Sequence, residues 1–160
     1  MGETLPVPAG NAAPALFAWA AQDPDAQPLQ RLQIVKGWTD ADGEVQEYTY
    51  DVACSDGLAV DSQTHRCPDN GASVDLADCT ATGNSGAPQL ATVWRDPDFD
   101  PAQRAFYYAR VLENPACRWS TYDLLESEGR IEPSSVMPKI IQERAWSSPV
   151  WLQPAGDNTQ

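Results

Sequence analysis

Four cysteines, Cys54, Cys67, Cys79 and Cys117, constrain the fold of this 160-residue chain more than any other feature. They are even in number and lie in loop-like sequence, of which residues 67–71 (CPDNG) are the clearest example. The sequence therefore predicts two disulfide bonds. We favour Cys54 with Cys67, which closes a short loop, and Cys79 with Cys117, which ties that loop region to a strand; the other connectivities stay open.

A zinc site is the alternative use of four cysteines. It needs thiolates at C-x2-C or C-x4-C spacing, usually with histidine nearby. The spacings here are far longer, and His65 is the one histidine in the sequence. We therefore expect no metal and no cofactor. Disulfides in turn indicate an oxidising compartment, either the periplasm or the cell exterior.

The charge of the chain limits its partners. The formal net charge is -13, with 23 acidic residues against 10 basic ones. Phosphate backbones and anionic lipid surfaces would be repelled, so we do not expect nucleic acid as a partner. No stretch reaches the ~18 apolar residues of a spanning helix, and no basic segment followed by an apolar one opens the sequence. We expect no membrane insertion.

Alternating apolar residues predict a β-hairpin over residues 31–38 and 44–53. The residues that share a face are Leu32, Ile34 and Trp38 in the first strand and Tyr48, Tyr50 and Val52 in the second. Residues 39–43 (TDADG) supply the turn. An EF-hand is the alternative for this Asp-x-Asp-Gly, but with Gly43 sixth in the loop the first ligand would be Trp38.

Shorter patterns predict the remaining elements. The expected strands are 12–21, which should be buried, 73–76, 88–94, 105–113 and 140–151, the last broken at Pro149. A helical turn at 101–104 precedes strand 105–113, for which a longer helix is the alternative. Ser120, followed by Asp123, is expected to cap a short helix that runs to about Ser127 and stops at Gly129.

Together these elements predict a single mainly-β domain, an antiparallel immunoglobulin-like sandwich with one short helix. The expected parts are an N-terminal segment with one strand at 1–28, the sandwich at 29–151, a disulfide-pinned insertion at 54–86 and a polar tail at 152–160.

Catalytic motifs are absent from the sequence. His65 lies alone in a loop, and neither a G-x-S-x-G elbow nor a phosphate loop is present, so we expect no catalytic residue in this chain. Two loops are candidates for the edge of a ligand site or of a site shared with another domain. The candidate residues are Asp96, Asp98, Asp100, Arg118 and Trp119. The three aspartates could bind calcium, but such residues more often cap turns.

Six tryptophans offer two interpretations. They are Trp19, Trp38, Trp94, Trp119, Trp146 and Trp151. Several lie within predicted strands beside aliphatic residues, so core packing is the favoured interpretation. The alternative is a flat aromatic platform that stacks on sugar rings.

Three segments, 29–57, 94–125 and 141–151, are distinctive together. They resemble the C-terminal part of the bacterial domain of unknown function 3604 family over residues 29–151, and the opening residues 1–6 (MGETLP) resemble family sequence slightly upstream. The resemblance implies that full-length members carry an upstream histidine-rich domain similar to PHP (polymerase and histidinol phosphatase) metal-dependent phosphoesterases. It also implies an immunoglobulin-like sandwich for the C-terminal region. Several converging ligands are needed for such a metal site, so His65 alone cannot supply it.

The resemblance favours a non-catalytic accessory domain that supports an upstream hydrolase or positions its substrate. Its expected partner is that upstream domain, and the shared substrate is a carbohydrate or a small anion. The alternatives are a carbohydrate-binding module and an enzyme fragment that contributes loop residues to a shared active site.

Overall fold

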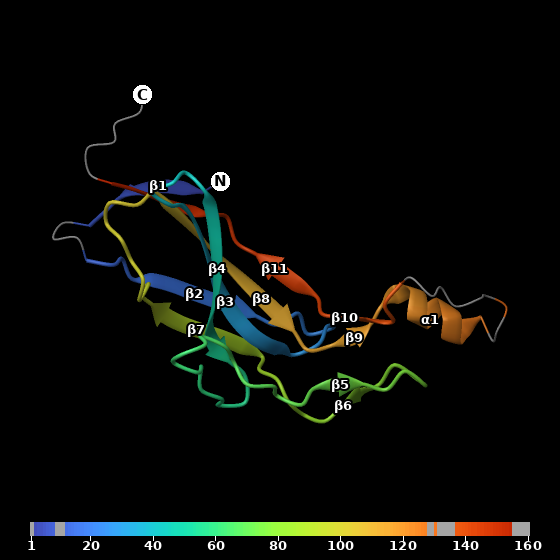
Figure 1. The fold of residues 1–160 in the computed structure, drawn as a ribbon. Coiled ribbons are helices and arrows are strands. Elements are labelled where there is room, and N and C mark those ends of the chain that lie inside the picture. Colours follow the sequence, from blue (N-terminus) through green and yellow to red (C-terminus); the bar gives the residue numbers. More distant parts are fainter. Residues whose placement is uncertain (1, 9–11, 128–129, 131–136, 155–160) are drawn as a thin grey trace.

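A computed structural model describes residues 2–8, 12–127, 130 and 137–154, and this part of the chain is mainly β with one short helix (Figure 1). The largest sheet has the order β1 (Glu3–Pro6), β12 (Val150–Gln153), β8 (Ala105–Glu113), β3 (Leu29–Thr39) and β4 (Val45–Cys54), and β11 (Arg144–Trp146) also pairs with β8. The two-stranded sheets are β2 (Leu16–Ala21) with β7 (Gln89–Trp94), β5 (Ser73–Val74) with β6 (Ala81–Thr82), and β9 (Ala116–Cys117) with β10 (Ile140–Ile141). The helix is α1 (Trp119–Glu126).

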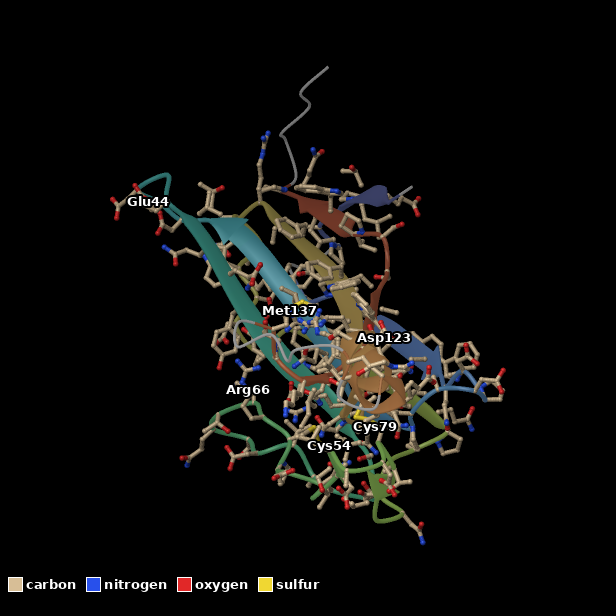
Figure 2. The ribbon with its side chains drawn as sticks, turned by 90° about the vertical axis from the view of Figure 1, so that its right-hand side faces the viewer. Glu44, Cys54, Arg66, Cys79, Asp123 and Met137 are labelled. Atoms are coloured by element: carbon tan, nitrogen blue, oxygen red, sulfur yellow. A yellow bond between two sulfur atoms is a disulfide. The ribbon has the colours of Figure 1, made fainter. Side chains whose placement is uncertain are left out.

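The predicted hairpin is confirmed as β3 and β4, in which Ile34 pairs with Tyr50. Its turn depends on Asp40, whose N–H donates to the Glu44 carbonyl at 3.0 Å. The Asp40 carboxylate accepts the N–H of Glu44 at 2.9 Å, and a hydrogen bond from Gln46 contributes most to lowering its pKa. Figure 2 shows Glu44 at the tip of this hairpin.

The core lies between the β2–β7 sheet and one face of the largest sheet. Its buried members are Ala18 and Leu90 from the small sheet, and Leu29, Leu32, Ile34, Ala105, Tyr107 and Leu152 from the large one. The strand prediction for 105–113 is confirmed over the helix alternative. Both edges of β8 are paired, with β3 on one side and with β11 and β12 on the other.

Both favoured disulfides are confirmed. Cys54 is bonded to Cys67 and Cys79 to Cys117, with sequence separations of 13 and 38. The first bond closes the loop that follows β4, and the second ties the loop after β5 to β9 (Figure 2). These bonds indicate an oxidising, non-cytoplasmic compartment.

Strand 12–21 was expected to be buried, and this is wrong for most of its length. β2 begins at Leu16, and Ala18 is its one buried residue, whereas the exposed fractions of Phe17 and Trp19 are 72% and 59%. The physical reason is that β2 belongs to a sheet that covers the core with one face. Alternate side chains therefore point outward.

The expected single strand at 140–151 is also wrong, because the segment forms β10, β11 and β12. β11 and β12 both pair with β8, but residues 147–149 lie opposite two residues of β8, so the ladder contains one extra residue at the predicted break. β12 continues to Gln153, into the expected tail, because Leu152 is buried in the core.

Two smaller expectations also differ. The sheets are not entirely antiparallel, because β1 pairs with β12 in parallel. The predicted helix is present, but its N-cap is Arg118 rather than Ser120, without a side-chain capping bond. The predicted stop at Gly129 lies outside the described residues. No helix in the described segments has the length and apolar character needed to cross a membrane.

The two disulfides should differ in their contribution to stability. Replacing both cysteines of the pair Cys79–Cys117 with serine should lower the free energy of unfolding by about 4 kcal/mol, and the same change in Cys54–Cys67 by about 3 kcal/mol, because the longer loop gains more entropy on release. Urea denaturation of the two double variants measures this. A larger loss for the shorter loop would contradict the loop-entropy explanation.

Candidate functional site

The carboxylate of Asp96 is buried and fully engaged. It lies 2.6 Å from Lys36 Nζ, accepts the hydroxyl of Tyr107 at 2.7 Å, and accepts the N–H of Asp98 at 2.9 Å. Lys36 Nζ also donates to the Asp98 carbonyl at 2.8 Å. The side chains of Lys36 and Asp96 are almost completely shielded from solvent, with exposed fractions of 3% and 2%. This closed ion pair therefore offers no free acid or base.

Two tyrosines complete this group. Tyr50 donates to the Asp98 carboxylate at 2.9 Å, as Tyr107 does to Asp96. Burial raises the pKa of both phenols well above the ordinary value, and the bonds to the aspartates raise it further. Both phenols therefore stay protonated over the physiological pH range and act as hydrogen-bond donors. We call Lys36, Tyr50, Asp96, Asp98 and Tyr107 the Lys36 cluster; it fastens the loop after β7 to the core.

Sequence reasoning missed Lys36, although a signal was present. Lys36 has the same parity in β3 as Leu32 and Ile34, which face the core. A lysine on an apolar strand face requires a buried partner, and in the structure Asp96 of the Asp-Pro segment after β7 is that partner. Asp100, the third aspartate of that segment, is exposed and accepts the N–H of Ala102 at 2.9 Å, so it caps the predicted turn at 101–104.

The structure does not bring Arg118 and Trp119 to this loop. They lie at the start of α1, at the opposite end of the molecule from the segment between β7 and β8 (Figure 1). The Arg118 N–H donates to the Lys139 carbonyl at 2.9 Å, and its buried Nε has no hydrogen-bond partner among the described residues. Trp119 is 66% exposed. The five candidate residues therefore do not form one site.

The loop closed by Cys54–Cys67 is held by a buried carboxylate. Asp51 accepts Gln33 Nε2 at 2.6 Å and the N–H of Cys67 at 2.7 Å. The Asp51 N–H donates to the carbonyl of His65, whose ring lies 5.2 Å from that of Tyr50. His65 is thus packed at the outer edge of β4. Within the described residues, no group of three or more His, Cys, Asp or Glu is placed to hold a metal ion.

Apolar side chains are exposed on the outer side of the β2–β7 sheet. Phe17 pairs with Val93, and their exposed fractions are 72% and 62%. Trp19 follows on the same face at 59%. We call these three residues the outer β2 surface. Core packing was expected for the tryptophans and is confirmed for Trp38 and Trp94, but Trp19, Trp119, Trp146 and Trp151 are exposed.

A cleft runs beside β2 over the part of the largest sheet formed by β8, β11 and β12. It consists of two adjoining cavities of about 420 and about 180 Å³, which share Ala109 and Ser147. Ala20 and Trp19 line it from β2, and Val111 lines it from β8. None of the described residues that line this β2 cleft is charged, although the chain carries a net charge of -13.

A second group of aromatic rings lies on the other face of the largest sheet. Trp151 of β12 pairs with Phe106 of β8, with ring centroids 4.9 Å apart. Tyr108 lies two residues along β8, and its ring is nearly parallel to that of Phe106 at 6.4 Å. The Phe106 ring covers Gly37, where a Cβ atom would collide with it. We call Phe106, Tyr108 and Trp151 the aromatic row.

Comparison with known proteins gives one result. A family model described as Protein of unknown function (DUF3604) matches residues 1–154. No curated protein and no solved structure matches the chain. The matched stretch includes residues 1–6 and 29–151, over which the resemblance was predicted, and also the intervening strand β2.

The Lys36–Asp96 pair can be tested by breaking it from one side. Lys36→Met leaves the Asp96 carboxylate buried without its counter-charge, so the free energy of unfolding should fall by about 3–5 kcal/mol. Lys36→Met with Asp96→Asn should recover much of that loss, because the uncompensated charge is gone while an acceptor for Tyr107 remains. Urea denaturation of the single and double variants measures both effects.

The matched control is Arg66→Met. Arg66 pairs with Asp51 at 3.8 Å and its side chain is 48% exposed, so its loss should cost less than about 1 kcal/mol. Equal losses for Lys36→Met and Arg66→Met would show that the Lys36 cluster does not hold the fold.

Proposed function

Because this chain belongs to DUF3604, a family described as proteins of unknown function, we propose that it is a non-catalytic accessory domain that packs against a hydrolase domain of the same parent protein. The observation that carries the proposal is the outer β2 surface with its adjoining cleft. Phe17, Trp19 and Val93 are exposed on one sheet face, whereas isolated apolar residues are the rule on a free surface. Such a surface fits contact with another folded domain.

The placement of ionisable groups supports the same role. The buried aspartates 51 and 96 are engaged by neighbours of the same chain, so they hold the fold and are not presented to a ligand. The segment between β7 and β8, to which Asp96 and Asp98 belong, and α1, which begins at Trp119, lie at opposite ends of the molecule (Figure 1). We therefore do not propose that these residues form one edge of a shared active site.

The accessory role also fits the fold and the compartment. We infer an immunoglobulin-like sandwich in which β2 and β7 cover part of the larger sheet, because buried residues of both sheets belong to one core cluster. The two disulfides support the periplasm or the cell exterior as the location of the parent protein. The net charge of -13 argues against nucleic acid as a partner.

A second candidate function is carbohydrate binding, and the aromatic row favours it. Trp151 is 48% exposed beside the half-buried rings of Phe106 and Tyr108. Next along β8 on that face is Arg110, whose guanidinium donates to Gln33 Oε1 at 2.7 Å. A site that binds a sugar requires aromatic rings on which the sugar ring can stack, with hydrogen-bonding groups held in place beside them.

Docking should lower the solvent exposure of Trp19 and leave that of Trp119 unchanged. These two tryptophans form a matched pair, because they are 59% and 66% exposed and lie on different elements. Hydroxyl-radical footprinting of the 160-residue chain and of the parent protein compares them directly. Trp19→Ser should weaken the domain contact by about 2 kcal/mol, as expected for a central aromatic residue. Equal reactivity of Trp19 in both proteins would contradict the proposal.

The carbohydrate function predicts that Trp151→Ala weakens binding to soluble polysaccharides about tenfold, because a stacking partner is lost. Affinity electrophoresis on a panel of such polysaccharides measures this, with Trp119→Ala as the control on an exposed tryptophan outside the aromatic row. If the polysaccharide retards Trp151→Ala, Trp119→Ala and the unchanged chain equally, the aromatic row is not the binding site.

A further inference from the structure

The edge of β2 that faces away from β7 is a free strand edge. The N–H of Gln22 donates to the Pro88 carbonyl at 2.9 Å and continues the β2–β7 ladder. In an antiparallel pair, bonding to the partner alternates between residues. Residues 16, 18 and 20 therefore bond to β7, and the N–H and C=O groups of Phe17, Trp19 and Ala21 point to the other edge. No strand in the described ranges pairs with that edge.

This edge lacks the devices that usually protect one. Edge strands are blunted by charged residues, prolines, bulges or covering loops. The sequence of β2, LFAWAA, contains no charge and no proline, and its pairing with β7 is regular. The outer strands of the largest sheet differ, because β1 contains Glu3 and Pro6, and β4 is met by the carbonyl of His65.

The β2 cleft lies along the same edge and is suited to an added strand. Its floor is formed by uncharged and mostly apolar side chains, among them Ile34, Ala109 and Val111. A strand hydrogen-bonded to β2 would place alternate side chains on this floor and the others outward beside Phe17 and Trp19. The added strand would enlarge the small sheet toward the uncovered part of the large one.

We infer that β2 accepts an extended strand of a partner polypeptide by β-strand addition in the β2 cleft. This inference rests on the proposed docking function and names the element that the hydrolase domain would supply. The uncharged cleft requires a strand with small apolar side chains at alternate positions. The net charge of -13 favours lysine or arginine at the ends of that strand and disfavours a second copy of this chain.

Amide hydrogen exchange tests this directly, in the 160-residue chain and in the parent protein. Strand addition should slow exchange at Phe17, Trp19 and Ala21 at least about tenfold in the parent protein, because these N–H groups become hydrogen-bonded. Residues 18 and 20 are the internal control, since β7 already protects them in both proteins. Trp19 footprinting on the same samples reports whether the surface is covered at all.

The two readouts separate the outcomes. A shielded Trp19 with unchanged exchange at Phe17, Trp19 and Ala21 overturns strand addition and leaves the docking function standing. An accessible Trp19 with unchanged exchange overturns both. Protection of the three amides in the 160-residue chain that disappears on dilution would show pairing between two copies and would also overturn the inference.

Proline variants provide a second test on the contact. Ala21→Pro removes an N–H that points to the free edge and keeps the β7 bonds, so it should weaken the contact about three- to tenfold. Ala91→Pro is the matched control, because Ala91 pairs with Trp19 and its N–H points away from β2. Equal effects of the two variants would contradict strand addition. Circular dichroism of both variants checks that each is folded.

Discussion

The ion pair between Lys36 and Asp96 is the interaction on which the arrangement of the two main sheets depends. Lys36 comes from the middle of β3, and Asp96 from the segment that leaves β7, so one short contact joins the two layers. Burying either charge alone would cost several kcal/mol. The pair is tolerated because Tyr107 and the backbone at Asp98 satisfy the remaining hydrogen-bonding positions. The pair holds the segment that leaves β7 against the large sheet.

The molecule therefore buries three charged side chains beside its apolar core and exposes apolar side chains on one sheet face. The interior contains Lys36, Asp51 and Asp96, each with partners in the same chain. Phe17 and Trp19 are exposed instead. Internal polar networks give a strand arrangement its uniqueness, because a shifted register would leave a charge unpaired. An exposed apolar face does not specify a strand arrangement within the chain. It can instead contribute to contact with another folded domain.

The sequence predicted those features that depend on local patterns. The β3–β4 hairpin follows from alternation around a turn, and the disulfide pairs follow from cysteines in loop-like sequence. Alternation also tells which residues of β2 share a face, but not which face is covered, so the exposure of Trp19 was not predictable. The parity of Lys36 did signal a buried partner. The parallel pairing of β1 with β12 joins distant parts of the sequence and has no local signature.

That parallel pairing has a mechanical consequence. β1 and β12 lie side by side, with Leu5 opposite Leu152, and the Val7 N–H donates to the Gln153 carbonyl just beyond the pair. Tension that pulls the start of β1 and the end of β12 apart acts along the strands, so the ladder is loaded in shear and its hydrogen bonds share the force. An antiparallel pair pulled from one end would open one bond at a time. This edge of the sheet is thus built to resist stretching.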